Sequence, residues 1–175
     1  MKKIGIVTDS HSSISQEEAK KLGIFVLPMP FYIDGECYYE SVTLSRELFF
    51  EKLTSGADIS TSQPSPTAVM EIWDKALEEY EKILYMPISS GLSSSYNTAM
   101  MLAQEEKYEG RVLVVDDGQV AAPLHQMILD TLDMIEKGYE AEHIRELLEK
   151  AGDRMMIYIA LQTLEFLKKG GRVTP

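Results

Sequence analysis

The stretch KILYMPISSGLSSSYNTAM, residues 82–100, joins an apolar run to a loop that carries five serines in seven positions. The run at 82–88 is short and mostly apolar rather than alternating, which predicts a strand that is covered on both faces. Residues 94–107 have the spacing of an amphipathic helix. A buried strand that leads through a polar loop into a helix indicates parallel strands joined by crossover helices.

The same order of elements recurs along the chain. Short apolar and β-branched runs predict further strands at 3–8, 24–29, 111–115 and 155–161. Amphipathic stretches predict further helices at 14–22, 66–80, 122–137 and 141–151, before a last helix that ends at Gly170-Gly171. Ser65 suits a helix cap and Pro66 a first helical position. Gly138 and Gly152 suit helix ends.

One stretch breaks this order. In FYIDGECYYE, residues 31–40, the pair Asp34-Gly35 lies between aromatic and β-branched residues, which predicts a hairpin. The predicted fold class is therefore α/β: a three-layer domain with a mainly parallel sheet and a small β-hairpin excursion at about 31–40.

Composition excludes several classes of partner and site. The 175 residues are 45% hydrophobic and 26% charged, as in ordinary globular proteins, and their formal net charge is −11. Such a chain repels phosphates at long range, which argues against nucleic acid or an anionic membrane as a partner. The single cysteine, Cys37, permits no internal disulfide, and three scattered histidines make no metal site. No apolar run suits a signal peptide or a membrane span, so we expect a cytoplasmic protein.

Polar loops follow several of the predicted strands or precede a helix. They lie at 8–13, 58–66, 89–95 and 116–119. Because ligands of open parallel sheets bind beyond the carboxyl ends of the strands, we expect these loops to gather at one rim. None of them contains Lys or Arg, which a polyphosphate site would normally supply. The anion that fits is a carboxylate, held by hydroxyls, backbone N–H groups and a helix dipole.

A structural interpretation competes with this functional one. Ser and Thr are the usual helix caps and turn formers, so about half of these hydroxyls are expected to satisfy only local backbone groups. The five serines at 89–95 exceed what one helix cap needs, which favours a binding role for that loop.

Four motifs resemble those of the DegV family of bacterial lipid-binding proteins. They are VTDSHSS at 7–13, STSQPSP at 60–66, ISSGLSSSYNTA at 88–99 and LEFLKKGGRV at 164–173. Their order and spacing also match, so the resemblance spans essentially the whole chain.

The resemblance implies a fatty-acid carrier that has no catalytic activity of its own and no cofactor. The acyl chain of the bound fatty acid would lie in an apolar tunnel, with the carboxylate near the rim. The implied partner is a separate kinase subunit that resembles dihydroxyacetone kinase. It would phosphorylate the presented carboxylate to an acyl phosphate.

The resemblance also carries the family's ligand-binding residues onto this chain by position. Thr61 and Ser93 are matched to the head group, and Ser62 and Gly91 shape the same loops. Ser10, in the element Thr8-Asp9-Ser10, lies close by. Arg172 matches the family's Gly-Gly-Arg element. Whether Arg172 contacts the ligand, contacts the partner or stabilises the fold stays open.

Family members usually continue into a second α/β domain that covers the acyl chain and lends a histidine to the head group. We therefore expect residues 1–160 to form the family's N-terminal α/β domain. Residues 161–175 would begin a truncated second domain, of which the rest is missing. The segment after VVDD is usually rich in Ser and Gly, but here reads GQVAAPLHQM, residues 118–127.

A serine hydrolase is the alternative from another class of function. The strand, the loop SSGLSSS and the helix imitate a nucleophile elbow with Ser93 as nucleophile, although Ser95 stands where that motif has its last glycine. Candidates for the acid and the histidine are Asp116 or Asp117 and His125 or His143.

The histidines have simpler interpretations as well. Surface or cap positions suit His125 and His143, whereas His11 is the one histidine in a rim loop. A third alternative is a purely structural or interaction domain, which would carry no ligand.

Overall fold

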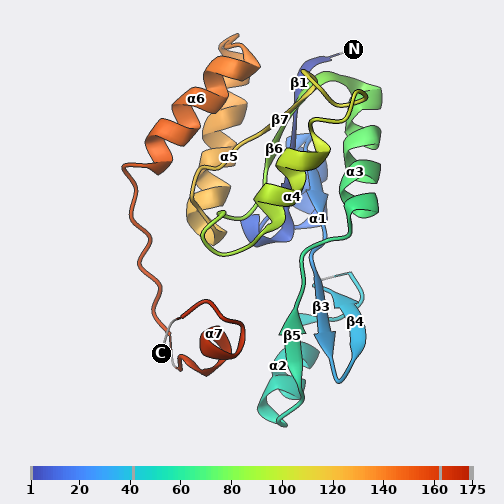
Figure 1. Ribbon diagram of the computed structural model, residues 1–175, viewed down its shortest axis with the longest axis vertical. Helices are drawn as coiled ribbons and strands as arrows, with labels where there is room; N and C mark the ends of the chain where they lie inside the picture. The colour runs from blue at the N-terminus through green and yellow to red at the C-terminus, as the bar shows by residue number, and fades with distance from the viewer. Residues whose placement is uncertain (1, 41, 162, 174–175) are drawn as a thin grey trace. The chain divides into compact units, whose positions relative to one another are not determined.

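The computed structural model describes residues 2–40, 42–161 and 163–173 (Figure 1). The chain divides into two compact units. The first unit comprises residues 1–29 and 63–155, and the second comprises residues 30–62 and 156–175. The predicted domain boundary at residue 160 stays a prediction.

The first unit is built on a parallel sheet of four strands in the order β2-β1-β6-β7. The strands are β1 Lys2–Asp9, β2 Phe25–Leu27, β6 Tyr80–Met86 and β7 Val112–Val114. The longest pairing joins β1 to β6, from Lys2 beside Tyr80 to Thr8 beside Met86. Because the strands are parallel, the loops that follow β1, β6 and β7 leave the sheet at the same edge.

Helices cover both faces of this sheet. One apolar cluster joins strand residues such as Ile6 and Leu84 to α5 (Ala121–Glu136) and α6 (Ala141–Gly152) through Ile128 and Ile144. The other cluster joins Val7 and its neighbours to α3 (Pro66–Glu79) and α4 (Ser95–Leu102). In Figure 1, α5 and α6 accordingly lie on one side of the strands and α3 on the other. The predicted three-layer α/β architecture with a mainly parallel sheet is confirmed.

The helices of the first unit lie close to their predicted positions. They are η1 Ser10–Ser12, α1 Gln16–Leu22, α3 Pro66–Glu79, α4 Ser95–Leu102, α5 Ala121–Glu136 and α6 Ala141–Gly152. The side chain of Ser65 caps α3 by accepting the N–H of Ala68, and Pro66 is the first helical residue, as predicted. Helix α4 is shorter than predicted, because turns replace it after Leu102 and bring Tyr108 into the core.

Two glycines allow close approaches in this unit. A Cβ on Gly5 would lie 2.6 Å from the ring of Tyr80, so the side chain of Tyr80 can cross β1 only at a glycine. A Cβ on Gly152 would lie 2.2 Å from the carbonyl oxygen of Asp117. The packing of α6 against the loop after β7 therefore requires Gly152, which is the last residue of the helix.

The second unit contains a three-stranded antiparallel sheet in the order β4-β3-β5. Its elements are β3 Pro30–Ile33, β4 Glu36–Tyr39, α2 Arg46–Thr54, β5 Ile59–Thr61 and α7 Glu165–Lys169. Strands β3 and β4 form the predicted hairpin, in which Asp34 and Gly35 have φ angles of 51° and 86°. Positive φ at both central residues is what a two-residue hairpin turn of type I′ requires.

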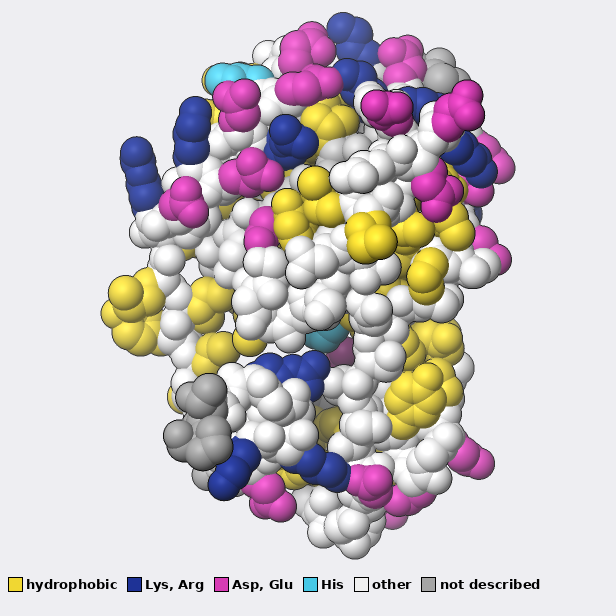
Figure 2. Space-filling view, viewed as in Figure 1, with side chains coloured by type: hydrophobic (Ala, Val, Ile, Leu, Met, Phe, Trp, Pro, Cys, Tyr) yellow, Lys and Arg dark blue, Asp and Glu magenta, His cyan; other side chains and the backbone are white. Residues whose placement is uncertain are grey.

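Two sequence-based predictions differ from the structure here. Residues 59–61, predicted as part of a polar loop, form β5, because β3 offers them an unpaired edge. Residues 155–161, all of which the structure describes, form no strand although they were predicted as one. A strand needs a neighbour for its backbone hydrogen bonds, and this segment pairs with none of the described strands. Figure 2 shows hydrophobic side chains on the extended segment after α6, where Met156 and Tyr158 are 74% and 88% exposed.

Candidate ligand-binding site

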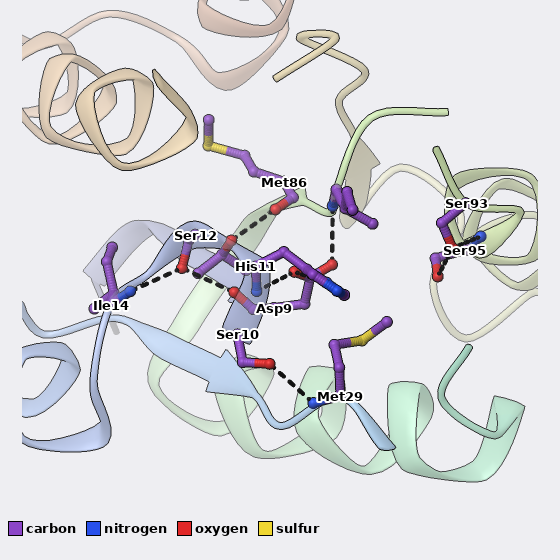
Figure 3. A network of polar contacts seen from close by, with 11 residues as sticks. Asp9, Ser10, His11, Ser12, Ile14, Met29, Met86, Ser93 and Ser95 are labelled. Atoms are coloured by element: carbon purple, nitrogen blue, oxygen red, sulfur yellow. Dashed lines mark hydrogen bonds and ion pairs between the residues drawn. The ribbon is translucent and has the colours of Figure 1, made fainter. Parts of the chain in front are cut away.

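The loop that follows β1 is organised by the buried carboxylate of Asp9 (Figure 3). Its Oδ1 accepts the backbone N–H of His11 at 2.9 Å and lies 3.1 Å from the Nδ1 atom of the same residue. Its Oδ2 accepts the backbone N–H of Ile88 at 2.8 Å. One side chain therefore joins the loop after β1 to the residue directly before the serine loop at 89–95.

The hydroxyls around Asp9 fix the neighbouring backbone. Thr8 donates to the carbonyl of Met86 at 2.7 Å, and Ser12 donates to the carbonyl of Asp9 at 2.8 Å. The Oγ atom of Ser10, a predicted ligand residue, accepts the N–H of Met29 at 3.1 Å. A hydroxyl both accepts and donates, so Ser10 keeps its own hydrogen for another acceptor.

The serine loop is partly satisfied by its own hydrogen bonds. The Oγ atoms of Ser93 and Ser95 lie 2.8 Å apart, and the N–H of Ser95 donates to Ser93 at 3.2 Å. The N–H of Gly91 donates to the Oγ of Ser89 at 3.2 Å. These local bonds agree with the structural interpretation of the sequence. Whichever of Ser93 and Ser95 accepts in their pair retains a hydroxyl hydrogen that can bind a ligand.

The loop after β7 contains a second buried carboxylate, that of Asp117. Its Oδ1 accepts the N–H of Gln119 at 2.9 Å, and the amide nitrogen of Gln119 donates to the carbonyl of Asp117 at 3.0 Å. Among the described residues, Oδ2 of Asp117 and Oε1 of Gln119 have no partner. Burial, with a smaller contribution from the nearby Asp116 and Asp9, raises the pKa of Asp117 to about 6.

Three of the predicted site residues lie in the second unit. The Nη2 atom of Arg172 donates to the Oγ1 of Thr61 at 3.3 Å, and its Nη1 donates to the carbonyl of Gly170 at 3.0 Å. The N–H of Ser62 donates to the carbonyl of Pro30 at 3.4 Å. Two residues 111 positions apart in the sequence are thus brought together. Because Thr61 belongs to the second unit and Ser93 to the first, their sharing of one head group stays a prediction.

The histidines proposed for a hydrolase have other contacts. The Nε2 atom of His125 lies 3.2 Å from the Oε1 atom of Glu18 in α1. The ring of His143 stacks on that of Tyr139, with the ring centroids 5.6 Å apart. The Oδ1 atom of Asp116 accepts the N–H groups of Ser90 and Gly118. Instead, the structure pairs His11 with Asp9. Sequence reasoning missed this pair, and the only available signal was the spacing Asp-x-His in a loop after a strand.

Other kinds of site find no support in the described part of the chain. No group of three or more His, Cys, Asp or Glu side chains there could hold a metal ion. Nor does any helix within the described ranges have both the length and the apolar character needed to cross a membrane.

Comparison with known protein families and sequences shows which proteins this chain is similar to. Residues 3–175 match the model of a family described as "Uncharacterised protein, DegV family". A DegV domain-containing protein of Deinococcus radiodurans is 33% identical over 171 residues, which are 97% of this chain and 60% of the relative. A DegV domain-containing protein of Caldanaerobacter subterraneus is 29% identical over 99% of this chain and 62% of its own length. The chain thus spans about three fifths of the curated relatives that it matches.

Solved structures of DegV family and fatty-acid-binding proteins are also similar to this chain. The structure described as fatty acid binding of a DegV family protein from Thermus thermophilus is 32% identical, with a TM-score of 0.84 over 97% of this chain and 60% of that one. The stearic acid-binding protein from Eubacterium ventriosum is 25% identical, with a TM-score of 0.81 over 98% of this chain and 60% of that one.

Proposed function

Because the chain belongs to the DegV family, we propose that it binds a long-chain fatty acid and presents the carboxylate to a kinase subunit in the cytoplasm. The observation that carries this proposal is the similarity to the Thermus thermophilus protein, which is described as binding fatty acid. That similarity covers almost the whole of this chain. The kinase, which resembles dihydroxyacetone kinase, supplies the chemistry, and the protein itself is a carrier without catalytic activity or cofactor.

The proposed contacts of the carboxylate are side-chain donors. Ser10 and the pair formed by Ser93 and Ser95 each keep a hydroxyl hydrogen after their internal bonds are made. In the second unit, Thr61 accepts from Arg172, so its own hydroxyl hydrogen is available as well. Ser62 directly follows Thr61, and Gly91 lies in the same loop as Ser93. The proposed ligand-binding residues are therefore Thr61, Ser62, Ser93, Gly91, Ser10 and Arg172.

The acyl tail and the carboxylate head group contribute differently to the free energy of binding. Each buried CH₂ group contributes about 0.8 kcal/mol, so the acyl chain supplies most of the binding free energy. A hydrogen bond to a charged group contributes about 1.5–3 kcal/mol, which is enough to orient the carboxylate but not to retain a lipid against the cost of association. Loss of head-group contacts should therefore weaken binding without abolishing it.

The proposal is tested by calorimetric titration of the protein with palmitate, after mass spectrometry of an organic extract has identified the fatty acid that copurifies. We expect the variant with both Thr61→Ala and Ser93→Ala to bind palmitate at least about a hundredfold more weakly, because two charged hydrogen bonds are lost. Ser94→Ala is the matched control, since Ser94 is exposed and its side chain makes no capping hydrogen bond.

Two results would contradict the proposal. An extract without any fatty acid, together with no heat of binding, would favour a purely structural domain. Stoichiometric labelling of Ser93 by a fluorophosphonate probe would indicate a hydrolase instead.

A further inference from the structure

In the rim loops of the first unit, backbone N–H groups at the start of the serine loop are already used within the loops, so the donors left for an anionic ligand are mainly neutral hydroxyls. The N–H groups of Ser89, Ser90 and Gly91 donate to Gln119, Asp116 and Ser89 itself. The loops at 8–13, 89–95 and 116–119 contain no Lys or Arg. His11 is the only residue in these three loops whose side chain can carry a positive charge.

The position of His11 is set by Asp9. Among the described residues, His11 is the only basic side chain within ion-pair range of this buried carboxylate. A buried carboxylate is costly unless it is paired and hydrogen-bonded, so the contact between Asp9 and His11 has a strong physical reason to persist. The second oxygen of Asp9 holds Ile88, which precedes the serine loop. The imidazole and the serine loop are therefore fixed to the same side chain.

The chemistry of the pair determines which ring nitrogen is available. Both oxygens of Asp9 accept backbone N–H groups, and an ionised carboxylate only accepts, so the hydrogen in the 3.1 Å contact lies on Nδ1 of His11. Nε2 is left for another partner. The side chain of His11 is 37% exposed, whereas Asp9 is fully buried. In Figure 3 the ring points away from Ser12 and toward the side on which Ser93 and Ser95 lie.

We propose that His11 recognises the carboxylate of the bound fatty acid through Nε2, and that Asp9 is the positioning residue that holds the imidazole in this orientation. The inference rests on the proposed function and adds the group that distinguishes an acid from a neutral lipid. When the imidazole is protonated, Nδ1 donates to Asp9 and Nε2 donates to the ligand. A neutral hydroxyl of the serine loop can bind an alcohol as well as a carboxylate, whereas a charged imidazole adds an ionic attraction that only the carboxylate can use.

Selectivity for palmitate over hexadecanol, which has the same tail and a neutral head, tests the inference. The protein is titrated with each ligand, first unchanged and then with His11→Gln, which removes the charge but retains a hydrogen-bonding group. We expect His11→Gln to lower the ratio of the two affinities about tenfold, mainly through weaker palmitate binding. His143→Gln is the matched control, since His143 stacks on Tyr139 in another part of the first unit.

The role of Asp9 needs a readout that a merely structural contribution would not change. Nitrogen-15 NMR of the imidazole reports the tautomer of neutral His11, and we expect hydrogen on Nδ1 in the unchanged protein. Asp9→Asn should shift that population toward hydrogen on Nε2 and lower the selectivity in the same direction. If Asp9→Asn does not fold, the tautomer of the unchanged protein and the selectivity of His11→Gln decide the matter.

The outcomes separate the two proposals. A protein that binds palmitate selectively and keeps its full selectivity with His11→Gln would overturn the inference alone. A hydrogen found on Nε2 in the unchanged protein would also overturn it. If the unchanged protein binds neither palmitate nor hexadecanol, the proposed function fails and this inference fails with it.

Discussion

The two units hold their polar residues in different ways. In the first unit, Asp9 and Asp117 are buried at the edge of a parallel sheet that has an apolar cluster on each face. In the second unit, the side chains of β4 and β5 are exposed or half-buried, and the sheet is supported by ring contacts of Phe31 with Tyr38 and Phe49. Thr61 and Arg172 meet there at the surface.

This difference determines what a substitution should do. A buried group that loses its partner or its packing costs the full desolvation or cavity energy, whereas an exposed group is compensated by water. Substitutions of buried residues in the first unit should therefore lower the stability strongly, and substitutions of exposed or half-buried residues in the second unit should lower it less.

The largest expected effect is that of Trp73→Ala in α3. Trp73 is fully buried and packs edge-on against Tyr85 and Tyr108, at centroid distances of 5.3 Å for both. Its truncation should cost about 3–5 kcal/mol of unfolding free energy. Phe49→Ala in the second unit should cost about 1 kcal/mol, because Phe49 is only half-buried. Urea unfolding followed by far-UV circular dichroism measures both values. Equal costs would refute the proposed contrast between the units.

An intermediate effect is expected at Asp117, and it depends on pH. Its pKa is about 6 in the folded protein against 3.8 for the ordinary group, so the folded state binds this proton more tightly than the unfolded state does. The resulting stability is fully present below about pH 4 and is lost as the pH rises through about 6, a loss of up to about 3 kcal/mol.

Asp117→Asn should remove this loss, because asparagine cannot ionise and its oxygen can still accept the N–H of Gln119. We expect the variant to be up to about 3 kcal/mol more stable than the unchanged protein at pH 8, and equally stable near pH 3.5. The exposed Asp153 provides the control Asp153→Asn, for which no such dependence is expected. A stability difference that is the same at every pH would contradict burial as its cause.

The smallest effect on stability is expected from Arg172→Ala. The hydrogen bond from Arg172 to Thr61 joins two exposed residues, so its loss should change the unfolding free energy by no more than about 0.5 kcal/mol. Thermal unfolding measures this change, with Lys168→Ala on the neighbouring exposed helix as control. A loss of several kcal/mol would show that the second unit is held by this contact rather than by its aromatic side chains.

Local patterns predicted much of the fold. The apolar run before the serine loop predicted β6, Ser65-Pro66 predicted the start of α3, and Asp34-Gly35 predicted the hairpin turn. These predictions succeed because burial on both faces, helix capping and positive φ each depend on residues close in the sequence. The strand predicted at residues 155–161 is not formed, because the hydrogen bonds of a strand depend on a neighbouring strand that no local pattern specifies.

For the candidate site, the sequence by itself determined which loops are rich in hydroxyls and which lack Lys and Arg, since composition fixes the available donors. Only the tertiary structure decided how those donors are used. Asp9 meets Ile88 from 79 positions away, and Arg172 meets Thr61 from 111 positions away. Such contacts depend on strand order and on the packing of whole elements. The pairing of His11 with Asp9 is close in sequence, but its significance comes from burial of the carboxylate, which the sheet and its covering helices create.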